Sequence, residues 1–370
     1  MKKNNHCFLI AATLAVFLTF VVCGGGGNGS GSNPGKQRDV YVVGIGTPPE
    51  ETGTLWKNGV RQVLSLTISG LKTHPCSVFV SGNDVYVFGY ETYETSPGAY
   101  DYSYVLWKNG IPQRIGNRPW NGGDMTFSER PDSLFVSGND VYLVGQDNEG
   151  FAVLWKNGVK QRLSESPAYA SSVFVSGGDV YASGGAVIWK NGVMQVLQMP
   201  ADMPGYERWV LPSTSLSVSG NDVYVVGTFR VNRSTMVPPA YTDYGLLWKN
   251  GVPQFIRNNP NNNPNYGHDL LSESADSVFA LGDDVYVVGP GRLFSNQGGT
   301  RLWKNGVPQL FGNNPYLPGA PYNGSYSLYV SDNDIYIVGN RVGYSPGGFW
   351  VNGVRQDLEG GFGYSSVFVK

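Results

Sequence analysis

The chain has 370 residues and a formal net charge of −2, and only 15% of its residues are charged, against about 25% in average globular proteins. Its 51 glycines are about twice the usual share, which favours a β-rich protein with many turns. No basic patch stands out, and this argues against nucleic acid as a partner.

The first predicted element is an export signal over residues 1–22. Lys2 and Lys3 precede an uncharged, mostly apolar run that is shorter than the about 20 residues of a membrane-spanning helix. The run ends at Cys23, and a stretch rich in Gly and Ser follows. This arrangement resembles a bacterial lipoprotein signal, and the resemblance implies that Cys23 is lipidated and becomes the mature N-terminus. The alternative is an uncleaved signal anchor.

Residues 23–38 have the composition of a flexible tether, and the part after Cys23 would span roughly 20 Å on average. With the signal removed and Cys23 acylated, Cys76 is the only thiol left, so no internal disulfide is expected. We therefore expect an exported protein that is anchored by its lipid in a bacterial cell envelope, in the outer membrane if the cell is Gram-negative.

Residues 39–370 repeat one unit seven times. Each unit contains a segment like DVYVVG and, after a variable gap, a segment like LWKNG, with a Gln six residues after the Trp. The repeat tryptophans are Trp56, Trp107, Trp155, Trp189, Trp248, Trp303 and Trp350. A repeat of this length is the strongest indication of the architecture in the sequence.

Each repeat predicts four strands. SVFV and DVYVVG are rich in Val, Phe and Tyr, which favour strands, and the short SGN between them predicts a hairpin. LWK and VPQ flank Asn-Gly, which suits a two-residue type I′ turn. Pro112, Pro253 and Pro308 lie in the last of the four strands, and proline cannot donate to a ladder, so this strand should be outermost. Repeated four-stranded antiparallel units predict a β-propeller with seven blades.

The two chain ends predict a closed ring. The array begins with the second strand of a repeat, at Asp39, and stops after a first strand, at residues 366–369. The C-terminal strand therefore supplies what the first blade lacks, and a solenoid with two capped ends is excluded. We expect a monomeric disc.

Length variation is confined to two of the four connections in each repeat. The hairpins SGN and Asn-Gly are constant in length, and their turns share one face of the disc, called the constant face here. The other two connections vary and share the opposite, variable face. Aromatic residues among Asn, Pro and Gly on that face are typical of a binding surface. The candidate ligand-binding residues are Trp120, Trp209, Tyr93, Tyr100, Tyr102, Tyr206, Tyr241, Tyr244, Tyr266, Tyr316 and Tyr322.

The repeated residues have two interpretations. Trp, Asn, Gly and Gln could form seven equivalent ligand sites, as in some lectin propellers, or could serve the turn and the packing between blades, which we favour. The Lys of each WKNG could contact anionic lipid head groups or protect the sheet from edge pairing. The acidic turns at residues 147–150 and 332–334 fall short of a calcium loop, so neither a metal nor another cofactor is expected.

Enzyme chemistry finds little support in the sequence. Only His74 and His268 follow the predicted signal peptide, and no nucleophile motif accompanies either. A glycosidase needs only two carboxylates at a suitable separation, and several acidic residues, such as Glu91, Glu94 and Asp243, lie in variable segments. No catalytic residue is assigned.

The combined repeat VYVxG…WKNGxxxxL…SxFVSGxD is similar to the repeats of bacterial surface lipoproteins predicted to be propellers, and it covers residues 39–370. The resemblance implies fold and location but no ligand. We expect a lipid-anchored protein that binds a glycan or a protein through its variable face. One alternative is a carbohydrate-active enzyme, a glycosidase or lyase, at the mouth of the central channel, marked by a carboxylate pair with a raised pKa in one member. The other is a passive scaffold in an envelope complex.

Overall fold

The computed structural model describes residues 38–49, 51–68, 71–96, 99–118, 130–200, 207–233, 240–256, 272–292, 298–311, 316–320, 326–340 and 346–370. The predicted signal peptide, Cys23 and nearly all of the predicted tether lie outside these residues. The chain from Arg38 to Lys370 forms one compact unit. Within the described ranges, no helix is long and apolar enough to cross a membrane.

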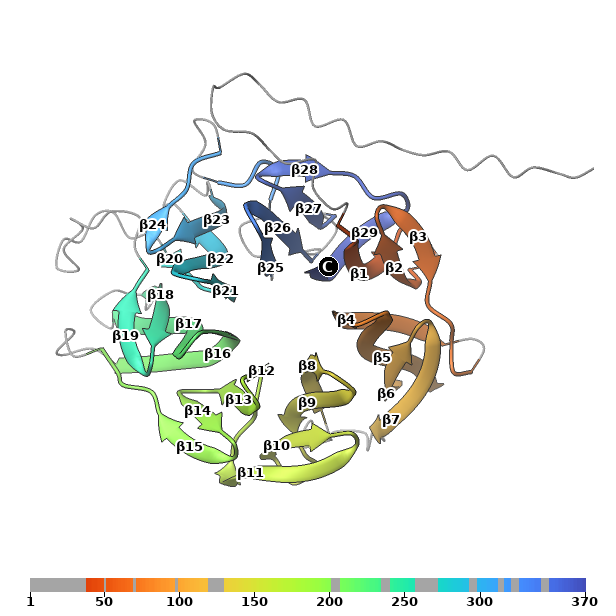
Figure 1. Ribbon diagram of the computed structural model, residues 1–370, viewed down its shortest axis with the longest axis horizontal. Coiled ribbons are helices and arrows are strands. Elements are labelled where there is room, and N and C mark those ends of the chain that lie inside the picture. Colours follow the sequence, from red (N-terminus) through yellow and green to blue (C-terminus); the bar gives the residue numbers. More distant parts are fainter. Residues whose placement is uncertain are drawn as a thin grey trace, which may run out of the picture. The chain divides into compact units, whose positions relative to one another are not determined.

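Seven antiparallel sheets surround a common centre, and each is one blade (Figure 1). Blade 1 contains β1 (Val40–Gly46), β2 (Gly53–Lys57), β3 (Val60–Val63) and the C-terminal β29 (Gly361–Val369). Blade 2 contains β4 (Lys72–Ser81), β5 (Asp84–Ser96), β6 (Ala99–Lys108) and β7 (Ile111–Arg118). Blade 3 contains β8 (Arg130–Ser137), β9 (Asp140–Gln146), β10 (Phe151–Lys156) and β11 (Val159–Pro167).

The remaining blades follow the same order. Blade 4 contains β12 (Ser172–Ser176), β13 (Asp179–Gly184), β14 (Val187–Lys190) and β15 (Val193–Val196). Blade 5 contains β16 (Glu207–Ser219), β17 (Asp222–Arg233), β18 (Ala240–Lys249) and β19 (Val252–Phe255). Blade 6 contains β21 (Ser277–Leu281), β22 (Asp284–Arg292), β23 (Gly298–Lys304) and β24 (Val307–Pro308), with the short β20 (Ser272–Glu273) also paired to β22. Blade 7 contains β25 (Tyr326–Ser331), β26 (Asp334–Gly339), β27 (Gly348–Val351) and β28 (Val354–Gln356).

The ring closes as the chain ends predict. In blade 1 the innermost strand is β29, which pairs antiparallel with β1, so that Val369 lies opposite Val40 and Val367 opposite Val42. The backbone N–H of Asp39 donates to the carbonyl of Lys370 (3.0 Å), and the N–H of Lys370 donates back (2.9 Å). The seven-bladed propeller and its closure by the C-terminal strand are therefore confirmed.

The aspartate that opens the second strand of each blade fastens the two hairpin turns of the constant face together. In blade 2, Asp84 accepts hydrogen bonds from Asn109 (2.8 Å) and Lys108 (2.7 Å). Asn109 in turn accepts from the N–H of Val85 (2.8 Å) and has the positive φ of 53° that the type I′ turn requires. The hydrogen bond from Lys108 holds the pKa of Asp84 below its ordinary value.

The Asp–Asn bond recurs in all seven blades at 2.7–2.9 Å. The lysine pairs with the aspartate in the six blades that have one, at 2.7–2.8 Å. The repeated Asp, Lys and Asn therefore build the constant face, and the lysine charges are balanced there.

Arg38 takes the place of the lysine that blade 7 lacks. The position that holds Lys in the other blades is Val351 there. Arg38 reaches across the ring closure, donates to the carbonyl of Ser331 (3.1 Å) and to Asp334 (3.4 Å), and also pairs with Asp332. A residue that lies two positions before the first strand thus completes the last blade.

Arg38→Ala should lower the free energy of unfolding by about 1 kcal/mol, the value of a partly exposed ion pair with good geometry. Urea unfolding of the wild type and the variant measures this loss. Lys57→Ala removes the equivalent bond from blade 1 and is the matched control, so similar losses are expected. An unchanged stability for Arg38→Ala beside a loss for Lys57→Ala would show that the arginine does not complete blade 7.

Each blade is fixed to the next by a repeated serine and a repeated tryptophan. The serine seven residues before the repeat aspartate accepts a hydrogen bond from a backbone N–H of the following blade at four junctions, at 3.1–3.3 Å. Ser366, the equivalent serine of the C-terminal strand, does so at a fifth junction (3.3 Å). Every repeat Trp except Trp155 is at most 1% exposed. Trp107 of blade 2, for example, packs on Tyr41 and Leu64 of blade 1 and donates to the carbonyl of Ser65 (2.7 Å).

A steric constraint explains why the DVYVVG segment ends in glycine. A Cβ on Gly44, Gly89, Gly184 or Gly289 would lie 1.9–2.3 Å from a carbonyl oxygen of the adjacent innermost segment. The innermost strand bulges toward its partner at this level in blade 2, where the register shifts between Pro75 and Ser77. Only glycine permits that approach.

Candidate functional site

Two blades extend far beyond the rest on the variable face. β5 continues to Ser96 after Gly89, and β17 continues to Arg233 after Gly227, whereas β13 ends at Gly184. The long insertions of blades 2 and 5 thus form strands, because alternating sequences such as YETYETS have strand propensity. We refer to blades 2 and 5 as the tall blades.

The tall blades hold most of the predicted aromatic candidates that the structure describes. Tyr93 lies on β5 and Tyr100 and Tyr102 on β6, and Trp209 lies on β16 and Tyr241 and Tyr244 on β18. Tyr316 lies after β24. Trp120, Tyr206, Tyr266 and Tyr322 are outside the described residues. All of the described candidates except Tyr316 therefore fall on two separate blades, and these lie on strands and not on loops.

The side of blade 2 that faces blade 3 presents a row of three partly buried rings, called the aromatic strip here. Tyr102 contacts Tyr90 edge-on, with 5.6 Å between ring centroids, and Tyr90 stacks on His74 at 4.8 Å and 19°. The strip continues from a buried cluster of blades 2 and 3 that contains Phe88 and Trp155. It comes from three neighbouring strands, β6, β5 and β4, so its rings are held by the sheet.

Only Tyr102 of this strip is among the candidates from the sequence. His74 is placed opposite Tyr90 by the register of β4 and β5. The repeat pattern does not predict this contact, because the register that brings His74 opposite Tyr90 depends on the bulge after Pro75. Thr92 adds a hydroxyl 3.5 Å from His74 Nε2. The strip thus combines ring surface with groups that can donate and accept hydrogen bonds.

The other side of blade 2 holds a buried carboxylate. Glu91 is fully buried and accepts a hydrogen bond from the N–H of Thr67 (2.7 Å) and another from its hydroxyl. Arg114 lies 3.9 Å from the same carboxylate. Glu91 therefore fastens the connection between blades 1 and 2.

Tyr244 and Tyr316 are used in packing. Tyr244 contacts Phe255 edge-on at 5.9 Å, beside a buried cluster of blades 4 and 5. Tyr316 lies under the guanidinium of Arg301, with 4.4 Å between Cζ and the ring centroid, and covers Gly299. Their roles in the disc account for both rings without a ligand.

Six aromatic rings form an arc around the centre of the disc. They stand at equivalent positions of the innermost strands, and neighbouring centroids are 4.6–4.9 Å apart. In order around the ring they are Phe174, Phe135, Phe79, Phe368, Tyr329 and Phe279. Blade 5 has Ser217 at this position, and its hydroxyl accepts from the N–H of Ala280 (3.0 Å). The arc narrows the centre of the propeller.

Asp276 lies just before β21, toward the variable face. Burial raises the pKa of its carboxyl to about 7, although a backbone hydrogen bond from Tyr326 opposes the shift. Tyr326 is itself buried, and its hydroxyl hydrogen-bonds Thr300, while its pKa is raised above the ordinary value by burial. No second carboxylate contributes to the shift of Asp276. Asp276 thus has the raised pKa that the enzyme hypothesis requires of one member of a carboxylate pair.

The acidic turn after β9 is held within the protein. Asp147 accepts from the N–H groups of Glu149 and Phe151, both at 3.0 Å, and from Arg162 at 3.2 Å. Although burial opposes it, these hydrogen bonds lower the pKa of Asp147. Among the residues that the structure describes, no three His, Cys, Asp or Glu side chains are grouped as metal ligands would be.

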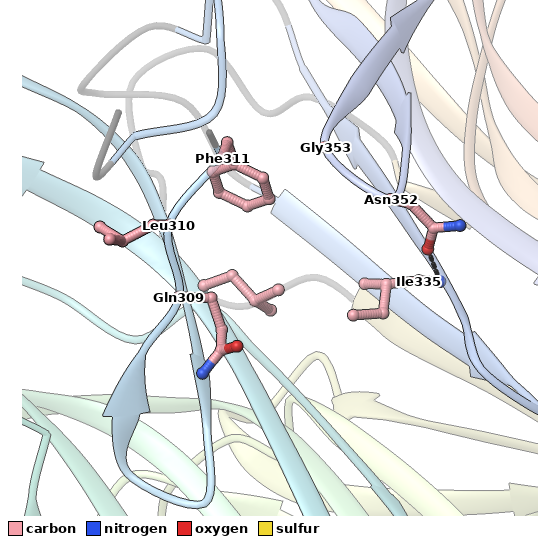
Figure 2. Close-up of a pocket in the computed structure, with 7 residues that line it drawn as sticks. Gln309, Leu310, Phe311, Ile335, Asn352 and Gly353 are labelled. Atoms are coloured by element: carbon pink, nitrogen blue, oxygen red, sulfur yellow. Dashed lines mark hydrogen bonds between the residues drawn. The ribbon is translucent and has the colours of Figure 1, made fainter. Parts of the chain in front are cut away.

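A pocket of about 180 Å³ lies between the outer parts of blades 6 and 7 (Figure 2). In blade 1, Leu64 lies eight residues after the repeat Trp and is buried against blade 2. In blade 6 that role falls to Leu317, next to the carbonyl that accepts from Trp350 (3.0 Å). The residue eight after Trp303, Phe311, is displaced onto Gly353, where a Cβ would lie 2.0 Å from the ring.

The pocket follows from this shift. Its walls include Leu302, Phe311 and Ile335. Its two polar side chains already bond within the protein, Asn352 to the N–H of Ile335 (2.9 Å) and Gln309 to the carbonyl of Val307 (2.9 Å).

The constant face carries a ring of exposed aliphatic side chains. In every blade the residue after the Asn-Gly turn is Val or Ile, and each is 50–73% exposed. These residues are Val60, Ile111, Val159, Val193, Val252, Val307 and Val354. We call this set the apolar rim.

Comparisons with known proteins give only structural alignments of low identity and low TM-score. No family model matches the chain, and no curated protein matches it significantly. The β-propeller domain of the Trilobed protease from Pyrococcus furiosus aligns with a TM-score of 0.41 and 8% identity, over 77% of this chain and 82% of that one. A puromycin-hydrolyzing peptidase from Mycobacterium tuberculosis aligns with a TM-score of 0.40 and 13% identity, over 78% of this chain and 47% of that one. A thermostable family-43 glycoside hydrolase aligns with a TM-score of 0.32 and 10% identity, over 70% of this chain and 99% of that one.

Proposed function

We propose that the protein is a lipid-anchored binding protein of a bacterial cell envelope, and that it recognises a glycan through its variable face. The aromatic strip of blade 2 is the observation that carries this proposal. His74, Tyr90 and Tyr102 are partly exposed, come from three paired strands and are held by contacts between their rings. Preorganised rings lose little entropy on binding.

The chemistry of the strip favours a sugar. A pyranose ring has flat apolar C–H faces that pack on aromatic rings, and its hydroxyl groups need donors and acceptors at the edge of the contact. His74 and Thr92 supply such groups beside Tyr90. A protein ligand would need a larger surface and is the outcome to test against.

The proposed anchor agrees with the direction in which the chain enters the disc. Arg38 contacts Ser331 and Asp334 at the turns of the constant face. A tether that begins at a lipidated Cys23 and ends at Arg38 therefore reaches the constant face, which leaves the variable face directed away from the membrane.

Tyr102→Ala should weaken glycan binding at least about tenfold, as the loss of a central aromatic contact does. A glycan array identifies the ligand of the wild-type protein, and calorimetry with that glycan measures the loss. Tyr102→Phe keeps the ring and should keep most of the affinity. Tyr241→Ala, on the other tall blade, is the matched control.

Two results would count against the proposal. Unchanged binding by Tyr102→Ala, with a loss for Tyr241→Ala, would move the site to blade 5. An array without any bound glycan, together with a protein captured by the wild type but not by Tyr102→Ala, would replace the glycan by a protein ligand.

One observation favours a second function. The carboxyl of Asp276, with its pKa raised to about 7, matches the requirement for a general acid near neutral pH. A carbohydrate-active enzyme at the centre of the variable face would use it. A glycosidase needs a second carboxylate as well, so the binding function is the better supported.

A further inference from the structure

The apolar rim is more regular than strand propensity requires. β-branched residues suit the first position after a type I′ turn, but Thr has the same shape and a similar propensity. All seven blades nevertheless place an aliphatic side chain there, and each is at least 50% exposed. Single exposed aliphatic residues need no explanation. Their recurrence at one position of every blade is the regular feature that calls for a common partner.

The arrangement of the apolar rim favours a planar partner. Equivalent residues of a closed ring of blades stand at the same level of the disc, so the seven side chains surround the constant face at one height. A globular partner would touch a few of them, whereas a planar partner can touch all seven together. Leu281 is a further exposed apolar residue on this face, in the first turn of blade 6, where most other blades have Ser.

The charges beside the rim do not drive the contact. Each lysine that precedes an Asn-Gly turn pairs with the aspartate of its own blade at 2.7–2.8 Å. It also lies over the ring of a tyrosine, as Lys108 lies over Tyr86 at 5.2 Å. The lysines are therefore poor ligands for anionic lipid, and a contact through the rim should be insensitive to salt.

We infer that the constant face rests on the surface of a lipid bilayer, with the apolar rim among the head groups. This inference rests on the proposed lipid anchor, which supplies the partner. The residues between Cys23 and Asp39 would span roughly 20 Å, and Arg38 fixes the end of this tether to the constant face. A tether this short holds the rim at high effective concentration near the bilayer, so that a weak apolar contact is enough to orient the disc.

The experiment measures the depth of two fluorophores on the full-length protein in phosphatidylcholine vesicles. In a Cys76→Ser background, Asn83→Cys labels the constant face and Ser96→Cys labels the end of a tall blade. Spin-labelled lipid quenches a fluorophore only when it is close to the bilayer. We expect quenching at position 83, none at position 96, and no change in molar salt.

The variant that tests the rim carries Thr at all seven positions. Val→Thr and Ile→Thr keep the branched Cβ, so the disc should fold, and its melting temperature checks this. We expect the variant to stay on the vesicles through its lipid and to lose most of the quenching at position 83. Equal quenching in wild type and variant, or none in the wild type, would overturn the inference.

The design separates docking from anchoring. Cys23→Ala tests the lipid anchor through release from the membrane fraction. The chain from residue 24 onward, attached by an N-terminal His-tag to nickel-chelating lipid, tests docking without Cys23, and Arg38–Lys370 is a compact unit of its own. If this chain instead dimerises in sedimentation experiments, and the Thr variant does not, the rim binds a second copy and the inference falls.

Discussion

Removal of residues 366–370 is expected to unfold the whole disc and not to fray a single blade. These residues contain Val367 and Val369, which are buried between blades 1 and 7, and Phe368, which contacts Phe79 and Tyr329 in the aromatic arc. Burial of one such side chain contributes about 1.5–3 kcal/mol. The truncation should therefore cost on the order of 5 kcal/mol or more, which is comparable with the whole stability of many domains.

The truncation also opens the ring at both neighbours. Ser366 accepts from the N–H of Val78 in blade 2 (3.3 Å), and residues 40–43 of β1 lose their partners in β29. Thermal unfolding followed by circular dichroism should show a fall in Tm of more than about 10 °C, or no folded protein. Deletion of Lys370 alone is the control and should cost far less.

Complementation distinguishes loss of closure from general damage. A peptide of residues 361–370 should raise the Tm of the truncated chain, because it restores the partners that residues 40–43 of β1 have in β29. A truncated chain that keeps the Tm of the wild type would show that the C-terminal strand does not close the disc.

Much of this fold could be predicted from the sequence because each repeat carries its own hairpins. Asn-Gly allows the type I′ turn, and the structure has Asn58 with a φ of 51° at that position. The prolines place the outer strand, and Pro112, Pro253 and Pro308 do lie in β7, β19 and β24. These signals are local, so one sequence suffices to read them.

Contacts between blades could not be read in the same way. Arg38 completes blade 7 from the far end of the chain, and the serine bonds join residues of different repeats. The repeated sequence shows that such positions recur but not what they touch. In blade 6 the repeat pattern assigns Phe311 to the inner position, whereas an insertion gives that position to Leu317.

The sequence predicts on which face of the disc the candidate site lies, but not which residues form it. The variable lengths identify the variable face and its aromatic residues, but the sequence does not show which of them meet. Tyr102 joins His74 through Tyr90 because β4, β5 and β6 pair with a register that contains a bulge. Asp276 was missed because its raised pKa results from the protein packed around it, and nothing in the neighbouring residues signals that environment.

Asp276→Asn is expected to stabilise the protein at pH 8 and to leave it almost unchanged at pH 4. The folded protein has a pKa of about 7 at Asp276, against an ordinary value of 3.8. Below the ordinary value the carboxyl is protonated in both states and the full stability is present. As the pH rises, the unfolded chain ionises first, and stability falls until the folded protein ionises near pH 7.

The magnitude follows from the size of the shift. A difference of about three pKa units corresponds to about 4 kcal/mol, lost by the wild type between pH 4 and pH 8. Asn cannot ionise, and its carbonyl oxygen can still accept from the N–H of Tyr326, so the variant avoids this loss. Urea unfolding at pH 4, 6 and 8 measures both proteins. A difference between them that does not change with pH would refute the raised pKa.

The same variant decides what the carboxylate is for. An ionisable group whose raised pKa costs stability at neutral pH is typical of a functional site, where such a cost is tolerated. If the enzyme function holds, Asp276→Asn should abolish hydrolysis of the glycan identified on the array, while the affinity of the protein for this glycan stays intact. If binding is the whole function, Asp276→Asn should be more stable at pH 8 and bind as the wild type does, and the wild type should release no product.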